Sequence, residues 1–408
     1  MIFRTAVLIL TLIAALGAQD KLSLPAAIEA ALGAHPDIAA ARARVDYARG
    51  TRRQAGLTLN PHLVLQAENL RRSTTGNPFS YSQQADTFAY IQQQFEAGGK
   101  RTRRVEAADA AMAALNHDLA MMRLDVAARV KDAYWAAAGV QQAFELLETN
   151  QKTFQQIVEY HEIRVREGAM AESDLLRVRL EADRIALAAN QARLDAQRAR
   201  IQLFRAMGQS TFPEVALITS IALTDDPLIT PDIATSLERR PDVLAARANV
   251  EAARAGLRLQ RANARTDYSL LFGYKRTEGY NTVMGGVQWE LPWRNRNQGN
   301  IESASASIHE AEARLAATEA TARAEIEAAN SEYLIRRRQV HDFIDHFRQQ
   351  ASDTSRIAQA AYRLGGADLL RLLDAERLRI EIEILSVQSA AQYRQSKAAL
   401  ESAMGIIQ

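Results

Sequence analysis

The feature that most restricts how this chain can fold is an internal repeat. Residues 35–49 and 240–254 share nine identities in fifteen positions, Pro36 and Pro241 among them. Later landmarks keep the same order: Leu175-Leu176 corresponds to Leu372-Leu373, and Ala206-Met207-Gly208 corresponds to Ala403-Met404-Gly405. Because the two copies fill most of the chain, we expect each copy to be one structural unit. We place the first copy at residues 19–208, a linking segment at 209–230 and the second copy at 231–408.

The first residues are typical of an export signal. Arg4 precedes an apolar run from Ala6 to Leu16, which is followed by Gly17 and Ala18. This run is far shorter than the ~20 residues that a membrane-spanning helix needs. We therefore expect residues 1–18 to be a cleaved signal peptide, with an N-terminal core helix as the alternative. Since no later apolar run reaches that length, the exported protein would have to enter a membrane with strands.

The overall composition excludes several classes of function. Lysine and arginine number 50 against 48 acidic residues, so the chain lacks the basic excess of a nucleic-acid-binding protein. Cysteine is absent, which excludes disulfides, thiolate metal sites, a cysteine nucleophile and a lipidated N-terminal cysteine.

Long helices are predicted wherever proline is missing. No proline occurs between Phe79 and Phe212 or after Trp293, and these stretches are rich in good helix formers. In the second copy the apolar positions alternate steps of three and four, as in a coiled-coil seam. They are Ile301, Ala304, Ile308, Ala311, Leu315, Ala322, Ile326, Ala329, Tyr333, Val340, Phe343 and Phe347. A phase slip between Leu315 and Ile326 should unwind the supercoil locally.

The predicted helices form hairpins. A helix from Asn300 to Arg363 would be on the order of 95 Å long at 1.5 Å per residue. It ends before Gly365-Gly366, and helical spacing then resumes at Leu369. Gly168 has the same position in the first copy, so we expect each copy to contain one long antiparallel helix hairpin.

Two windows in each copy change to the period of two that is typical of strands. We predict strands at about 62–70 and 87–95, and again at about 268–276 and 282–290. The faces expected to be apolar carry Leu63 and Leu65 in the first copy and Tyr268, Leu270, Phe272 and Tyr274 in the second. Four strands cannot close a sheet, and open edges are costly in lipid, so closure would require other copies of the chain. A soluble strand hairpin is the alternative when these windows are considered alone.

Taken together, the chain resembles the TolC family of outer-membrane efflux proteins from about Leu22 to Gly405. The similarity is greatest to the CzcC-like heavy-metal branch. It lies in three short strings: Asn60-Pro61 leading to Glu68-Asn69, then Gly98-Gly99-Lys100-Arg101, and Arg296-Asn297-Gln298-Gly299 before a long helix, which Asn300 could cap. This resemblance implies a mainly α fold with a β-barrel portion. Three protomers would form an α-helical tunnel and contribute four strands each to a twelve-stranded outer-membrane barrel.

The same resemblance implies a function, partners and sites. The protein would be the passive exit duct of a tripartite efflux system in the bacterial outer membrane, with a long periplasmic helical extension, and would export metal cations in preference to other solutes. Its partners would be two further copies, a periplasmic adaptor protein, an inner-membrane RND-type pump and outer-membrane lipid. The periplasmic gate would include Asp374, with Arg371 where relatives carry a second acid, so that an Arg–Asp pair could replace a two-tier acidic ring. The adaptor would dock at the hairpin tips, on Gly168, Ala169, Gly365, Gly366 and Ala367.

Enzymatic motifs are absent from the sequence. It has no Gly-x-Ser-x-Gly, His-Glu-x-x-His or Gly-x-Gly-x-x-Gly, and Gly98-Gly99-Lys100 lacks the rest of a phosphate loop. We therefore predict no catalytic residue, cofactor or bound metal. A metal contact among His341, Asp342, Asp345 and His346 is a weaker possibility than ordinary charge patterning on a helix. Two alternatives stay open: an exported coiled-coil scaffold, and an outer-membrane component of drug efflux or type I protein secretion.

Overall fold

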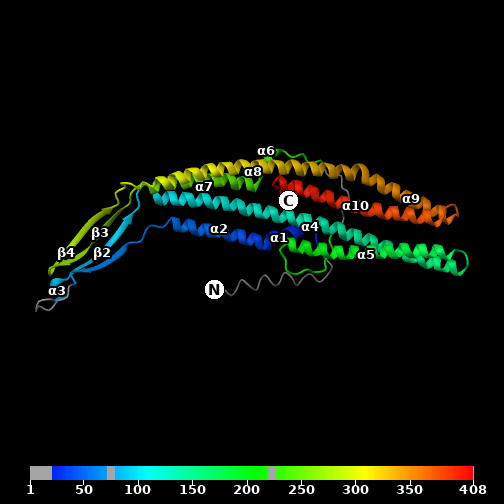
Figure 1. Cartoon of the computed structure of the whole chain (residues 1–408), viewed down its shortest axis with the longest axis horizontal. Coiled ribbons are helices and arrows are strands. Elements are labelled where there is room, and N and C mark those ends of the chain that lie inside the picture. The colour runs from blue at the N-terminus through cyan, green and yellow to red at the C-terminus, as the bar shows by residue number, and fades with distance from the viewer. Residues whose placement is uncertain (1–20, 71–78, 219–226, 408) are drawn as a thin grey trace. The chain divides into compact units, whose positions relative to one another are not determined.

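The computed structural model describes residues 21–70, 79–218 and 227–407 (Figure 1). The predicted signal peptide lies outside these residues. The chain divides into two compact units: one comprises Met1–Ala40, Ala120–Arg240 and Thr321–Gln408, and the other comprises Ala41–Leu119 and Pro241–Ala320. Each unit therefore draws on both copies of the repeat. The copies are halves of the sequence, whereas the compact units are built from segments of both halves.

The first unit is helical. It contains α1 (Leu24–Ala34), α5 (Glu172–Ala206), α6 (Ile233–Arg239), a π-helix η1 (Gln339–Ile344), α9 (Asp345–Arg363) and α10 (Leu369–Ala403). It also contains parts of α4 (Lys100–Arg166) and α8 (Gln298–Arg338), which belong to both units. In Figure 1, α9 and α10 run side by side as a hairpin. Within the described residues, no helix combines the length and the apolar character that crossing a membrane requires.

Both predicted helix breaks are tight turns of one kind. After α4, the Ala169 N–H donates to the Arg164 carbonyl at 2.8 Å, and the Gly168 N–H donates to the Val165 carbonyl at 2.9 Å. This pair of bonds is a Schellman motif, which places its glycine at positive φ, and Gly168 has φ 70°. The same two bonds recur after α9, where Gly365 has φ 75°. The chain thus reverses at equivalent points of the two copies.

Two apolar clusters of the described residues lie in the first unit. The larger one joins α4, α5 and α10 through Leu147, Phe154, Val178, Ile185, Ala189, Leu369, Leu372, Leu373 and Ile380. The smaller one joins α8, η1 and α10 through Tyr333, Val340, Tyr393 and Leu400. The start of the linking segment also contacts the first unit, because Leu217 forms a parallel β-bridge with Leu22. The Tyr134 hydroxyl on α4 donates a 2.9 Å hydrogen bond to the Leu22 carbonyl. Residues 219–226 of that segment lie outside the described residues.

The coiled-coil seam departs from the sequence prediction at η1. Ala322, Ile326, Tyr333 and Val340 are buried, as the spacing predicts. Phe343 and Phe347 were expected on the same seam but are exposed, and Ile344 is buried instead. A π-turn closes i to i+5 and so takes one more residue than an α-turn, which moves the following side chains around the axis. The phase slip between Leu315 and Ile326, by contrast, lies within continuous α-helix.

The second unit contains the sheet. Its elements are β1 (His62–Glu68), β2 (Asp86–Phe95), β3 (Tyr268–Thr277) and β4 (Tyr280–Trp289), with a short α3 (Tyr81–Gln84). It also includes α7 (Pro241–Asn263) and most of α2 (Pro36–Ala55). The strands lie in the order β1-β2-β3-β4, and every neighbouring pair is antiparallel. β2 and β3 come from different copies of the repeat, so their pairing joins the two copies into one sheet.

The joints between strands and helices explain the short strings noted in the sequence. Gly98 and Gly99 have φ 68° and 69°, and Lys100 pairs with Asp267 at 2.7 Å, which ties the start of α4 to the start of β3. At the other joint, Asn297 has φ 61° and its side-chain amide donates to the Gln260 carbonyl at 2.7 Å. Helix α8 begins at Gln298, so Asn300 lies inside the first turn and is not the cap that we expected.

Candidate functional site

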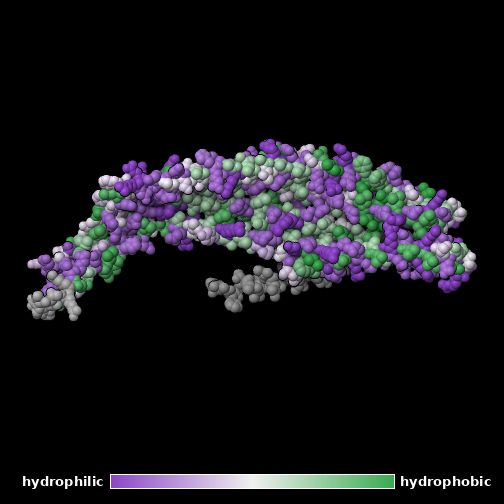
Figure 2. Space-filling model, viewed as in Figure 1, coloured by the Kyte–Doolittle hydropathy of each residue, from purple (hydrophilic) through white to green (hydrophobic). Residues whose placement is uncertain are grey.

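The two faces of the sheet differ in chemistry. Leu63, Ile91 and Phe272 are paired neighbours on β1, β2 and β3 and so lie on one face of the sheet. Leu65, Ala89 and Tyr274 form a second row of paired neighbours on the same face. Tyr268 and Leu270 lie on the same face, facing Trp289 and Val287 of β4. These side chains are largely exposed, with Leu65 at 72% and Phe272 at 69% of full accessibility. Hydrophobic residues are visible over the strands in Figure 2. The sheet thus presents an uncovered apolar face.

The opposite face is mainly polar. It carries Gln66, Gln92, Gln94 and Gln288, and the Gln92 amide donates to the Gln288 side chain at 3.1 Å across the sheet. Lys275 on the same face lies 5.4 Å from the centre of the Phe88 ring. One side of the sheet therefore suits hydrocarbon and the other suits water.

The hairpin turns leave small residues in open space. A Cβ atom added to Gly168 or Gly365 would meet no heavy atom within 4 Å. Asp368 caps α10, because its side chain accepts a 3.0 Å hydrogen bond from the Arg371 N–H. Helix termination thus accounts for the glycines, and the turns keep room for a close neighbour.

Arg371 and Asp374 both lie exposed on the first turns of α10. Among the ion pairs of the described residues, none joins these two side chains, so the Arg–Asp pair that we considered does not form within one chain. Arg377, one turn later, has its pKa raised above the ordinary value chiefly by its hydrogen bond to Glu381, with a smaller effect from the Asp374 carboxylate. Asp374 is therefore a solvated acid in the single chain.

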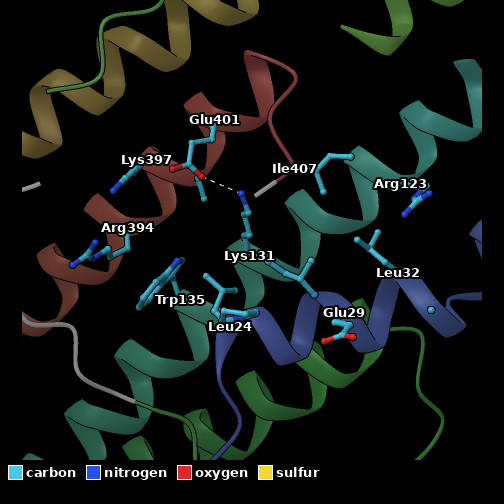
Figure 3. A pocket seen from close by; sticks show the side chains of 14 residues that line it. Leu24, Glu29, Leu32, Arg123, Lys131, Trp135, Arg394, Lys397, Glu401 and Ile407 are labelled. Atoms are coloured by element: carbon cyan, nitrogen blue, oxygen red, sulfur yellow. Dashed lines mark hydrogen bonds and ion pairs between the residues drawn. The ribbon is translucent and has the colours of Figure 1, made fainter. Parts of the chain in front are cut away.

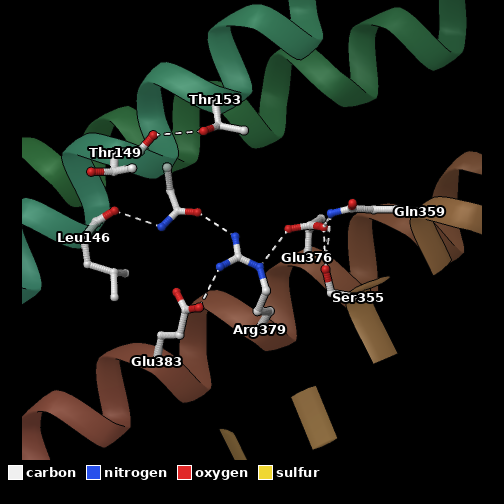
Figure 4. Close-up of polar contacts among 9 residues, drawn as sticks. Leu146, Thr149, Thr153, Ser355, Gln359, Glu376, Arg379 and Glu383 are labelled. Atoms are coloured by element: carbon white, nitrogen blue, oxygen red, sulfur yellow. Dashed lines mark hydrogen bonds and ion pairs between the residues drawn. The ribbon is translucent and has the colours of Figure 1, made fainter. Parts of the chain in front are cut away.

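A buried polar network lies next to these residues and was not predicted from the sequence (Figure 4). Glu376 is 6% exposed, and its carboxylate accepts hydrogen bonds from Ser355 at 2.6 Å, from Gln359 and from Arg379 at 3.0 Å. Arg379 also donates to Asn150 on α4 at 2.7 Å. One guanidinium therefore joins the first hairpin to the second.

The network keeps its acid ionised despite burial. Burial alone would raise the pKa of Glu376, but the hydrogen bonds from Ser355 and Gln359 and the charge of Arg379 outweigh it, so the pKa lies below its ordinary value. Glu376 stands four residues from Leu372 and from Ile380, both buried. An acid on that apolar stripe was the signal in the sequence that could have revealed the network.

The cluster of His341, Asp342, Asp345 and His346 forms no candidate metal site in the described part of the chain. No group of three or more His, Cys, Asp or Glu side chains there could hold a metal ion. His341 and Asp342 belong to η1, so the α-helical spacing that we used to place them beside Asp345 and His346 does not apply. His341 instead packs edge-on against Tyr393.

Comparison with known proteins identifies the family. The model of the family described as "Outer membrane efflux protein" matches residues 27–209 and 233–406. The cobalt-zinc-cadmium resistance protein CzcC of Cupriavidus metallidurans is 25% identical over 393 residues, which cover 95% of this chain and 91% of that protein. The nickel-cobalt-cadmium resistance protein NccC of Alcaligenes xylosoxydans xylosoxydans is 25% identical over 292 residues, or 71% of this chain and 65% of that protein.

The fold is also shared with solved structures. The open-state structure of the Neisseria gonorrhoeae outer membrane channel MtrE superposes with a TM-score of 0.77 at 18% identity, covering 94% of this chain and 89% of that one. The long hairpins and the four-stranded sheet thus define the channel fold of efflux proteins. The chain belongs to the outer membrane efflux protein family, and its place is the bacterial outer membrane.

Proposed function

We propose that three copies of this chain form a passive exit duct in the outer membrane. Their sheets join into one twelve-stranded barrel, and their helix hairpins form a tunnel that extends into the periplasm. In a tripartite system, an inner-membrane RND-type pump and a periplasmic adaptor deliver the solute, and this protein lets it leave without doing energised work.

The observation that carries the proposal is the open sheet with one apolar face. β1 and β4 each have a single neighbour in the described sheet, so each leaves one edge of backbone N–H and C=O groups without a strand partner. Unsatisfied backbone groups cost several kcal/mol each in hydrocarbon. Pairing β4 of one copy with β1 of the next satisfies both edges. The strands have 7 to 10 residues, close to the roughly 9–11 that a tilted membrane strand needs.

The hairpin turns and the start of α10 are the natural places for docking and gating. Both turns carry small residues at an end of the first unit without a Cβ obstacle, which suits contact with an adaptor. Asp374 is exposed beside the second turn, and threefold repetition would bring three carboxylates around one pore. Rings of carboxylates favour cations. The positive charge of Arg371 in each copy would temper this preference.

The proposed cargo is metal cations, because the curated relatives are named for cobalt, zinc, cadmium and nickel resistance. We expect loss of the gene to sensitise cells to divalent metals more than to drugs, and the protein to fractionate with the outer membrane as a heat-modifiable trimer. Lost drug resistance with unchanged metal tolerance would instead favour drug efflux, and lost secretion of a polypeptide would favour type I export. A water-soluble, elongated monomer would support the scaffold alternative and refute the duct.

The gate can be tested separately in planar bilayers. We expect Asp374→Ala to raise single-channel conductance or weaken block by divalent cations. Asp353→Ala is the matched control, since Asp353 is a half-exposed acid on α9 that pairs only with Arg356 one turn away among the ion pairs of the described residues. Identical current records for the Asp374 variant and the unaltered protein would remove Asp374 from the gate.

A further inference from the structure

The two copies of the repeat pack against each other inside the chain through α4 of the first copy and α10 of the second. Lys131 on α4 pairs with Glu401 on α10 at 3.0 Å (Figure 3). Further along the same helices, a Cβ atom added to Gly139 would lie 2.6 Å from the Cβ of Ala391, so the two helices approach closely there. One face of α10 is therefore covered by the first copy.

The repeat gives the position in one copy that corresponds to each residue of the other. Gly168 and Gly365 are 197 positions apart, whereas Val105 and Ile301, which both precede the level of η1, are 196 positions apart. The difference is the one additional residue that a π-turn takes. Residues before η1 therefore correspond at 196 positions, and residues after it correspond at 197.

The face of α5 that corresponds to the covered face of α10 is exposed. On α10 this face includes Ala391 and Ala398, and both are buried. The corresponding residues of α5 are Leu194 and Ile201, which are larger and exposed. The apolar face that the second copy buries within the chain is thus left open in the first copy.

The second copy leaves the complementary face open on the run from α8 to α9. Gly139 and Asn150 of α4 are buried on the side that meets α10. The corresponding residues of the second copy are Ile335 and Phe347, and both are exposed. Each copy therefore exposes the apolar face that its counterpart buries, and the two open faces are of different kinds.

We propose that these two open faces bind each other between neighbouring copies of the chain, so that the run from α8 to α9 packs antiparallel on α5 of the next copy. The inference rests on the proposed function, because the partner is a second copy. A repeat buries its apolar faces by stacking on its neighbours, and two different faces that pair head to tail close a ring. The close approach of Gly139 to Ala391 sets the register: its counterpart between copies is Ile335 against Leu194 of the partner subunit.

The spacing of the apolar residues fits this register. Leu194 and Leu187 are seven residues apart on α5, which is about two helical turns. Ile335 and Phe343 are eight residues apart, but η1 begins between them, and its additional residue keeps both on one face. Phe343 of one copy therefore meets the partner's Leu187. This contact accounts for the exposure of Phe343 in the single chain.

Charge is complementary in the same register. Glu332 and the partner's Arg198 come level on the flank of the two faces, and their side chains are 61% and 67% exposed in the single chain. An acid of one copy thus lies beside a base of the next. The cations Arg336 and the partner's Arg193 also come level, but Arg336 turns toward α10, where it donates to Gln392 at 2.8 Å.

The test is cysteine crosslinking in isolated outer membranes, because the natural chain contains no cysteine. After mild oxidation, Ile335→Cys with Leu194→Cys in every copy should give covalent dimers and trimers on non-reducing denaturing gels. Phe343→Cys with Leu187→Cys should do the same, and a reducing agent should return both to monomers. A disulfide requires Cα atoms within about 7 Å of each other, so these links report the register directly.

Ile335→Cys with Leu180→Cys is the matched control. Leu180 is exposed on the same face of α5 but lies fourteen residues from Leu194, about 21 Å along the helix. This variant should give less than a tenth of the crosslinked product. Variants with one cysteine alone should give none, because the two faces differ and neither residue meets its own copy.

Trimer formation is measured separately, as heat-modifiable mobility of the unoxidised variants. Trimers without the link between Ile335 and Leu194, or with an equal link through Leu180, would overturn the inference while the duct stands, and the open face of α5 would then be left to another protein. Monomers in both assays would refute the proposed function itself, and the inference with it.

Discussion

Replacing Arg379 by methionine tests whether the buried network joins the two helix hairpins. The change keeps most of the side-chain length but removes the guanidinium. Glu376 then keeps its hydrogen bonds from Ser355 and Gln359 and loses its only cationic partner among the ion pairs of the described residues. Asn150, itself 6% exposed, loses the donor to its amide oxygen. The substitution therefore removes the polar contact between α4 and α10 and leaves the apolar cluster between them in place.

The structure sets the size of the expected effect. Removing one partner of a buried ion pair costs about 3–5 kcal/mol. Here the Arg379 side chain is 22% exposed and Glu376 keeps two donors, so we expect the smaller loss of about 2–3 kcal/mol. At about 2–4 °C per kcal/mol for domains of this size, the melting temperature should fall by about 4–12 °C. Glu376→Leu combined with Arg379→Met should recover part of the loss, because no buried carboxylate is then left without its cation.

The assay is thermal unfolding followed by circular dichroism at 222 nm on the detergent-solubilised protein at pH 7. The control is Arg377→Met, two residues away on the same helix, because Arg377 is 52% exposed and pairs with Glu381 one turn later. That control should leave the melting temperature unchanged, since exposed ion pairs contribute little. Equal melting temperatures for Arg379→Met and Arg377→Met would refute the view that burial gives the network its importance.

Three further predictions follow from particular contacts. The folded-state pKa of Glu376 lies below its ordinary value of 4.5, so the ionised carboxylate stabilises the fold above pH 4.5, and this stabilisation is lost as the pH falls through the folded-state pKa. Glu376→Gln should therefore reduce the fall in melting temperature on acidification. An unaltered dependence of melting temperature on pH would contradict this. Gly168→Ala should lower the free energy of unfolding by about 1 kcal/mol, because of the positive φ alone. Gly208→Ala should lower it by about 2–4 kcal/mol, because the added Cβ would also lie 2.7 Å from neighbouring side-chain atoms. Equal melting curves for the two variants would contradict the steric contribution at Gly208. Leu65→Arg, on the apolar face of the sheet, should reduce the yield of heat-modifiable trimers, at about 2–4 kcal/mol near the bilayer centre, whereas Gln66→Arg on the polar face should not; similar yields would mean that the apolar face does not meet lipid.

The secondary structure of this chain could be predicted from the sequence more completely than the packing of its helices and strands. Absence of proline and the three-four spacing predict the long helices, and Gly168 and Gly365 mark their turns, because each of these signals is local. Alternation predicts the strands to within a few residues, and positions such as Leu65 and Phe272 fall on one face because side chains alternate along a strand.

The parts that were missed depend on contacts between distant segments. The position of Glu376 on the apolar stripe of α10 indicates burial, but its network was not predictable, because Ser355 lies on α9 and Asn150, which Arg379 binds, lies on α4. The exposure of Phe343 could not be predicted either, because a π-turn has no reliable sequence signature and one additional residue reverses an assignment made from spacing. The order of the strands could not be predicted either, because the pairing of β2 with β3 joins segments that are far apart in the sequence and belong to different copies of the repeat.

The π-turn at η1 affects how the helical run from α8 to α9 tolerates the insertion or deletion of a residue. Deleting one residue from Gln339–Ile344 would restore α-helical winding and leave the later side chains of α9 close to their present directions, because a π-turn takes one more residue than an α-turn for the same rotation. Deleting one residue from the α-helical winding of α8 would instead rotate every later side chain by about 100°. After that deletion in α8, Ala351 and Ser355, which now face inward, would turn toward water, and the Glu376 carboxylate would lose the hydrogen bond from Ser355. Insertions and deletions in the second copy are therefore restricted to loops, or to places where a turn of different pitch cancels the rotation.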